Sequence, residues 1–178
     1  NPTNSDKYKL KLKTYKNWSV YDYIDSVYRS TVIDIDGKAY FNDTIPVGDC
    51  KLYQMYPVVK FGGEIICSET ISSASLTENE LYINSGSTLT VTGTYNCYKN
   101  IVVNTGGKLS LKPNSTLNFY NGAKLVVNGA VSAIGNGNSQ VSIDFHGADG
   151  NTMNCIELNP GSIDTIHFCE IKNGYYGI

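Results

Sequence analysis

The sequence predicts an all-β protein in which a small antiparallel β module is followed by a coil of short, stacked parallel strands. From Leu81 onward, apolar residues alternate with other residues over three to five positions, and this period of two is typical of strands. The short runs also recur at intervals of eight residues, at Leu81 and Leu89 and again at Ile101, Leu109, Leu117 and Leu125. Each run is too short to be stable alone, so the runs must pack on one another.

Residues 1–70 predict the antiparallel module. Three strand-like runs, KYKLKLKTY, STVIDIDGKAYF and CKLYQMYPVVKFGGEIIC, alternate or are rich in β-branched and aromatic residues. The Asp36-Gly37 pair between two alternating runs predicts a hairpin. The segment NWSVYDYIDSVYRS has the apolar spacing of a short helix, but its Val, Tyr and Ser residues favour extended structure equally. We expect this module to be sandwich-like or to cap the open end of the coil.

Residues 71–178 predict the coil itself. A meander of hairpins is the alternative, but hairpins favour two-residue Asn-Gly or Asp-Gly turns between longer strands, whereas these strands are short and their turns vary. Three strands per coil place the coil starts at Leu81, Ile101, Leu125 and Ile156, with the polar insertion DFHGADGNTMN lengthening the last interval. Parallel crossovers are almost always right-handed, so we expect a right-handed parallel β-helix of three to four coils.

The alternation also divides the coil residues into an inward and an outward set. The residues expected to point inward are Leu81, Ile83, Leu89, Val91, Ile101, Val103, Leu109, Leu111, Leu117, Phe119, Leu125 and Val127. The residues expected to face solvent are Tyr82, Thr90, Thr92, Asn104, Ser110, Asn118, Tyr120 and Asn128, with Lys99, Lys108, Lys112 and Lys124.

Charge is distributed unevenly along the chain. Residues 81–143 contain four lysines and no Asp or Glu, whereas residues 144–178 contain five acidic residues and one lysine. The formal net charge is -2 and Arg29 is the single arginine, which argues against a nucleic-acid partner. No run of about 18 apolar residues is present, so the sequence predicts no membrane-spanning helix.

The phrases LYINSGSTLTV, IVVNTGGKLSLKPNSTLNFYNGAKLVVNGAVSAIG and IHFCEIKNGYYGI resemble the right-handed parallel β-helix repeats of secreted bacterial surface proteins, a pectate-lyase-like architecture. The resemblance implies this fold and an extracellular or cell-surface location. It does not imply one activity, because the architecture hosts lyases, hydrolases, adhesins and inert stalks. In the family the ending NGYYGI leads into another coil, so we expect a β-helix truncated at Ile178, with further coils in the parent chain.

Catalytic groups are sparse in the coil. The family's lyases and hydrolases place acids on one outer face, and between Leu81 and Ile143 no carboxylate exists to fill that role. The segment DFHGADG holds the catalytic candidates, Asp144, His146 and Asp149. On a strand, Asp144 and His146 would point to the same side, and Asp149 could reach back as a metal ligand or orienting carboxylate. The favoured alternative is a polar loop with Gly147 and Gly150 as turn formers.

The sequence predicts no metal and no cofactor. Asp34 and Asp36 precede a glycine, but oxygen ligands do not continue at alternate positions as a calcium loop requires, so a hairpin tip is favoured. The five cysteines contain no C-x-x-C pair, and they are expected to be buried thiols with room for one bridge. His167 lies between Ile166 and Phe168 and is expected to face solvent.

These observations predict a non-catalytic extracellular module with a structural, adhesive or glycan-contacting role. Tyrosines and amides suit sugar recognition, and lysines suit an acidic polysaccharide or cell-surface glycan. The candidate ligand-binding residues are Tyr82, Asn104, Lys108, Asn118 and Tyr120. The alternative is the N-terminal part of a β-helix polysaccharide lyase or glycoside hydrolase whose active face lies beyond residue 178.

Overall fold

The computed structural model describes residues 7–14, 17–29, 31–146 and 155–174. It is nearly all β, as predicted, with a parallel β-solenoid and a separate antiparallel module. Packing divides the chain into two compact units, residues 1–57 and residues 58–178. Among the described residues, the helical element is the single turn α1 (Val58–Phe61).

The first unit consists of two three-stranded antiparallel sheets, as the alternating runs predict. One sheet has the order β1 (Lys7–Lys13), β5 (Ala39–Pro46), β4 (Val32–Ile33). The other has the order β3 (Val27–Arg29), β2 (Trp18–Asp22), β6 (Tyr53–Pro57).

Two hairpins test the local predictions in this unit. The Asp36-Gly37 hairpin is confirmed: it joins β4 to β5, and Gly37 has a φ of 70°. At its tip, Asp34 Oδ1 accepts hydrogen bonds from the backbone N–H groups of Asp36 at 3.1 Å and Lys38 at 2.8 Å. The segment NWSVYDYIDSVYRS forms the second hairpin, β2 and β3, so the helical alternative is wrong there. Its β-branched and aromatic side chains fit a paired strand better than a helix surface.

An ionic cluster links the two sheets of the first unit. Arg29 on β3 donates to Asp22 Oδ2 at 2.8 Å and lies 3.2 Å from Asp43 Oδ2 on β5. Lys51 contacts Asp22 at 3.2 Å, and the Tyr53 hydroxyl donates to Asp43 at 2.8 Å. Burial alone would raise the pKa of Asp22, but the hydrogen bonds from Arg29, Lys51 and the backbone outweigh it and lower that pKa far below its usual value.

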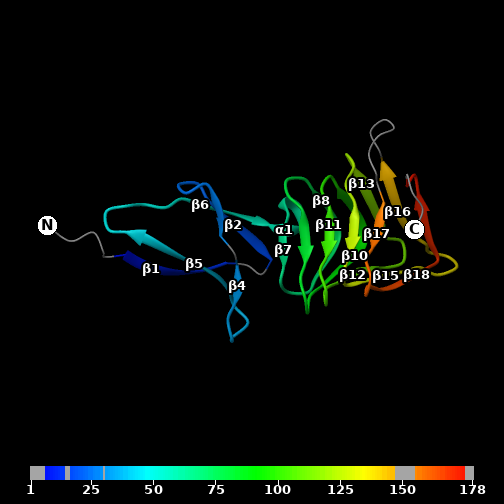
Figure 1. The fold of residues 1–178 in the computed structure, drawn as a ribbon, viewed down its shortest axis with the longest axis horizontal. Coiled ribbons are helices and arrows are strands. Elements are labelled where there is room, and N and C mark those ends of the chain that lie inside the picture. Colours follow the sequence, from blue (N-terminus) through cyan, green and yellow to red (C-terminus); the bar gives the residue numbers. More distant parts are fainter. Residues whose placement is uncertain (1–6, 15–16, 30, 147–154, 175–178) are drawn as a thin grey trace. The chain divides into compact units, whose positions relative to one another are not determined.

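The second unit is a solenoid of about four turns, built from three stacks of parallel strands (Figure 1). The first stack has the order β7 (Gly63–Ile65), β9 (Leu81–Ile83), β11 (Ile101–Val103), β14 (Leu125–Val127), β17 (Ile156–Leu158). The second and third stacks share β8 (Glu69–Leu76) and β10 (Thr88–Cys97), which bend through the corner between them. The second stack continues with β12 (Lys108–Leu111), β15 (Ala130–Ile134) and β18 (Ile163–His167). The third continues with β13 (Thr116–Tyr120), β16 (Val141–His146) and β19 (Cys169–Lys172).

Gly93 makes the bend in β10 possible. The pairing of β10 with β8 shifts register between Val91 and Thr94. A Cβ atom on Gly93 would lie 1.8 Å from the Ser72 carbonyl oxygen on β8, which no side chain tolerates. A glycine at this position therefore lets two coils approach closely at the corner.

The coil starts predicted from spacing are confirmed by the register. Leu81 pairs with Ile101, Ile101 with Leu125, and Leu125 with Ile156. Parallel pairing also begins one rung earlier, because β7 pairs with β9. The run CKLYQMYPVVKFGGEIIC is therefore not continuous strand: β6 belongs to the first unit, and α1 and β7 belong to the second. Gly62 ends α1 with a φ of +87°, where a Cβ atom would lie 2.2 Å from the Asn79 carbonyl oxygen.

The inward set is confirmed in full: none of its twelve members exposes more than 1% of its surface. Val58 and Val59 of α1 join the same core, and the Tyr95 hydroxyl donates to the Val59 carbonyl at 2.7 Å. One outward prediction is wrong, because Ser110 is buried. Its short side chain lies on the middle rung between Thr90 and Ser132 and is covered by these neighbours.

The cysteine prediction holds only for Cys97, which is buried in the solenoid core. Cys50 is exposed, and Cys67, Cys155 and Cys169 are partly exposed. All five cysteines lie in the described ranges, and none forms a disulfide. Burial raises the pKa of the Cys97 thiol well above its usual value, so this side chain acts as an apolar group of the core.

Candidate functional site

Three rings stack on the outside of the solenoid, at the end of its third strand stack. Tyr98 directly follows β10, Tyr120 ends β13 and His146 ends β16. The ring centroids of Tyr98 and Tyr120 are 4.8 Å apart, and those of Tyr120 and His146 are 4.6 Å apart. The paired planes are inclined by only 15° and 11°. Parallel strands repeat at about this distance, so in-register stacking of the coils itself creates this outer ring stack.

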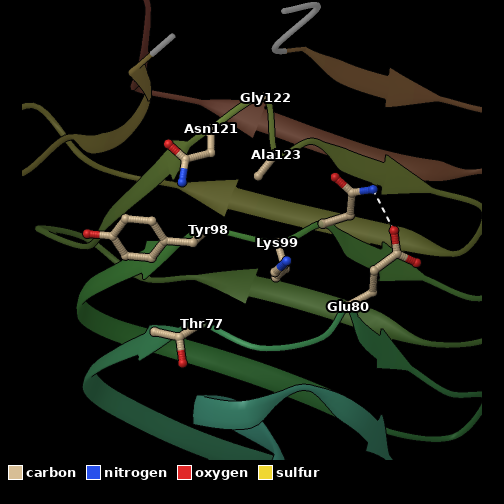
Figure 2. Close-up of a pocket in the computed structure, with 8 residues that line it drawn as sticks. Thr77, Glu80, Tyr98, Lys99, Asn121, Gly122 and Ala123 are labelled. Atoms are coloured by element: carbon tan, nitrogen blue, oxygen red, sulfur yellow. Dashed lines mark hydrogen bonds between the residues drawn. The ribbon is translucent and has the colours of Figure 1, made fainter. Parts of the chain in front are cut away.

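A groove lies beside Tyr98, at the corner between the third and the first strand stacks. Three loops that connect these stacks form it, after β8, β10 and β13. Its volume is about 500 Å³, within the range of small-molecule sites. The residues that line it are Thr77, Glu80, Tyr98, Lys99, Asn100, Asn121, Gly122 and Ala123. In Figure 2, Tyr98 and Glu80 lie on opposite sides of the groove with Lys99 between them.

Glu80 and Asn100 form a fixed polar wall in this groove. The Asn100 side-chain amide donates to Glu80 Oε1 at 2.6 Å, and the Tyr82 hydroxyl donates to Glu80 Oε2 at 2.5 Å. Asn100 Oδ1 accepts from the backbone N–H of Lys124 at 2.9 Å. The hydrogen bond to Glu80, together with burial, raises the pKa of Tyr82. Both oxygens of the Glu80 carboxylate are therefore already engaged within the protein.

Lys99 is the positive charge of the groove. Its side chain is exposed, and no described carboxylate forms an ion pair with it. The other lysine of this corner, Lys124, lies 3.9 Å from Glu157. An exposed ammonium beside an aromatic ring and two amides can bind a small polar or anionic ligand.

The five predicted ligand-binding residues do not form one site. Tyr82 lies on β9 of the first strand stack, Asn104 in the turn after β11, and Lys108 on β12 of the second stack. Asn118 and Tyr120 lie on β13 of the third stack, and only Tyr120 belongs to the outer ring stack.

Two of these predicted residues bond instead to the neighbouring rung. The Asn104 amide donates to Asn84 Oδ1 at 2.8 Å, and the Asn118 amide donates to Asn96 Oδ1 at 2.8 Å. The Asn159 amide donates to Asn128 in the same way at 2.8 Å. These ladders satisfy side-chain amides along the solenoid and stabilise the stacking of its coils.

Sequence reasoning did not single out Tyr98, Glu80 or Asn100. A signal for Tyr98 does exist, because Tyr98, Tyr120 and His146 are 22 and 26 residues apart, close to one coil each. Aligning the coils would have shown three rings at equivalent positions. The same alignment would have placed Glu80 and Asn100 side by side, because they are 20 residues apart and directly precede the coil starts Leu81 and Ile101.

Two of the three catalytic candidates, Asp144 and His146, lie close together on β16. Asp144 and His146 do lie on the same side of β16, with 3.6 Å between Asp144 Oδ2 and His146 Nε2. Asp144 Oδ1 also accepts from the Asn173 amide at 2.8 Å. Asp149 lies outside the described residues, as do Gly147 and Gly150.

Other predicted features concern metals and His167. Within the described ranges, no group of three or more His, Cys, Asp or Glu side chains is arranged to hold a metal ion. His167 is exposed on β18, as predicted, with its ring against the edge of Phe168.

In the part of the chain that the structure describes, no helix has the length and apolarity to cross a membrane. Comparison with protein-family models, curated proteins and solved structures gives no match.

Proposed function

We propose that this chain is a non-catalytic, extracellular module that contacts glycans, in a secreted or cell-surface bacterial protein with pectate-lyase-like β-helix architecture. The observation that carries the proposal is the outer ring stack beside the groove at Tyr98, Glu80 and Lys99. The resemblance of the repeats to those of secreted surface proteins supports the bacterial and extracellular parts of the proposal.

The chemistry of this surface suits a saccharide. Tyrosine rings offer an apolar face together with a polar hydroxyl, which matches the apolar faces and hydroxyl groups of sugar rings. Asn100 and Asn121 line the same groove with side-chain amides that hydrogen-bond to hydroxyl groups. A regular solenoid also repeats such groups along its axis, which suits a polymer with repeating units.

The charge pattern favours an acidic glycan. Residues 81–143 contain four lysines and no carboxylate. Lys99, Lys108 and Lys112 are exposed, and no described acid forms an ion pair with them. Lysines that form no ion pair attract a polyanion over a distance of about 10 Å, and salt screens this attraction.

The arrangement of acids supports a non-catalytic role. Glycosidic hydrolysis uses a pair of carboxylates that flank the scissile bond, one as acid and the other as base or nucleophile. Residues 81–143 contain no Asp or Glu, so these coils supply no such pair. Asp144 lies 3.6 Å from His146 and accepts a hydrogen bond from Asn173.

The proposal is tested by titrating the chain with acidic and neutral polysaccharides at low and at physiological salt. We expect saturable binding to an acidic polysaccharide that weakens as salt increases. Lys38, which is exposed on the hairpin of the first unit, provides a control: Lys38→Gln should leave binding unchanged. Absence of binding to every polysaccharide would refute glycan contact.

The same samples test the absence of catalysis. Unsaturated products and reducing ends are followed over time, with and without calcium, and we expect none above the background. Turnover that disappears in Asp144→Ala would overturn the non-catalytic assignment.

A further inference from the structure

Tyr98 is one of the two end members of the outer ring stack. Tyr120 has a ring on either side, whereas Tyr98 stacks on Tyr120 alone among the described residues. On the preceding rung, Cys97 pairs with Leu76, so the residue aligned with Tyr98 is Thr77. Threonine is too small to cover a phenol ring. Tyr98 is accordingly 38% exposed, and it lines the groove together with Thr77.

The groove beside this ring holds two charged side chains, and only Lys99 has neither a hydrogen-bond nor an ion-pair partner among the described residues. The two oxygens of Glu80 are engaged by Asn100 and Tyr82. The ammonium of Lys99 lies between Tyr98 and Glu80 and forms no ion pair with a described residue (Figure 2). An anionic group on a ligand therefore has a positive partner in this groove, although Glu80, which is hydrogen-bonded to two neutral groups, keeps its negative charge beside it.

From these contacts we propose that the groove is a subsite for one sugar residue that carries a carboxylate, as uronic acids do. The sugar ring stacks on Tyr98, its carboxylate pairs with Lys99, and its hydroxyl groups bond to the amides of Asn100 and Asn121. This inference rests on the proposed glycan contact, and it adds the ligand class and the place of binding.

The test compares an oligosaccharide of uronic acid with its carboxyl-reduced, neutral counterpart, which has the same length and linkage. Binding to the full chain is measured by titration calorimetry, and the binding place by amide chemical-shift changes. Because an exposed ion pair contributes little, we expect the acidic oligosaccharide to bind about two to five times more tightly. Equal affinity for both would overturn the assignment of an acidic sugar.

Two substitutions test the place of binding. Tyr98→Ala should weaken binding about tenfold, while Tyr98→Phe, which keeps the ring, should bind like the wild type. Lys99→Gln should abolish the preference for the acidic ligand. Lys38→Gln removes an equal charge on the first unit, away from the groove, so it should retain the preference.

The outcomes separate the subsite from the general function. If the wild type binds acidic polysaccharides but Tyr98→Ala and Lys99→Gln bind equally well, the subsite is refuted and the glycan-contacting role stands. If the wild type binds neither the oligosaccharides nor any polysaccharide, the general proposal fails first. We expect the amide spectra of Tyr98→Ala and Lys99→Gln to match that of the wild type outside the groove, and this comparison checks that each variant is folded.

Discussion

The two units of this chain are both built from β-strands, but their interiors are stabilised by different interactions. In the solenoid, apolar side chains at equivalent positions of successive coils stack directly on one another, as Phe119 does on Phe145 at 5.1 Å. In the first unit, the fully buried side chains include the carboxylate of Asp22, which Arg29 and Lys51 neutralise. A solenoid renews its core with every coil, whereas two small sheets supply few apolar residues and rely more on a polar network.

Polar groups show the same contrast. Outside the solenoid core, asparagines bond to asparagines of the next rung, as Asn104 does to Asn84. In the first unit, the cluster joins unlike residues from different strands, such as Tyr53 and Asp43. Repetition therefore satisfies polar groups in the solenoid, and specific pairing satisfies them in the module.

The largest expected effect concerns the apolar core. Leu117→Ala should lower the free energy of unfolding of the solenoid by roughly 2 to 5 kcal/mol, because it leaves a cavity between stacked coils. Thr90→Ala, at an outward position, should change it by less than about 0.5 kcal/mol. Hydrogen exchange of the amides of residues 81–143 during denaturation measures both. If both substitutions lowered the free energy of unfolding equally, the assignment of inward and outward residues along the strands would be wrong by one residue.

A second substitution addresses the ionic cluster. Asp22→Asn keeps the shape but removes the charge that Arg29 and Lys51 contact, and we expect a loss of about 2 to 3 kcal/mol in the first unit. Trp18 on β2 is the single tryptophan, so its fluorescence follows this unit during denaturation. Asp36→Asn at the hairpin tip is the matched control and should have little effect. A similar loss in both variants would contradict a special role for the cluster.

The pH dependence should differ between the first unit and residues 81–143 of the solenoid. The folded-state pKa of Asp22 is lowered, so its contribution to stability is present above the unfolded-state pKa of about 3.9 and is lost as pH falls further. Residues 81–143 contain no carboxylate to titrate. Trp18 fluorescence should therefore report unfolding at a lower denaturant concentration at pH 3 than at pH 7, while core amides of residues 81–143 remain protected. If the amides of residues 81–143 also lost protection at a lower denaturant concentration at pH 3 than at pH 7, the expected difference in pH dependence would be refuted.

The smallest expected effect concerns the amide ladders. Asn104→Ala removes the hydrogen bond to Asn84, and we expect a loss of about 1 kcal/mol, typical of one hydrogen bond. Asn138→Ala, on an exposed turn, provides the control and should cost less than about 0.5 kcal/mol. Thermal denaturation resolves the difference. If Asn138→Ala costs as much as Asn104→Ala, the ladder adds nothing to the stacking of coils.

Much of the solenoid was determined by its sequence. The alternation placed Leu109, Leu117 and Leu125 inside, and the spacing placed successive coils in register at Leu81 and Ile101. Such features are readable because each depends on neighbours a few residues away and on a repeat that recurs every coil. The Asp36-Gly37 hairpin is local in the same sense.

Tertiary structure decided the features that depend on residues from several coils. Tyr98, Glu80 and Asn100 meet in one groove because their loops stack at one corner, and Ser110 is buried because its neighbours on both sides cover it. The Asp22 cluster likewise needs two sheets to meet. The alternation shows only which face of a strand a residue occupies, whereas a site also requires that loops far apart in the sequence come together, and this depends on the lengths of all the coils between them.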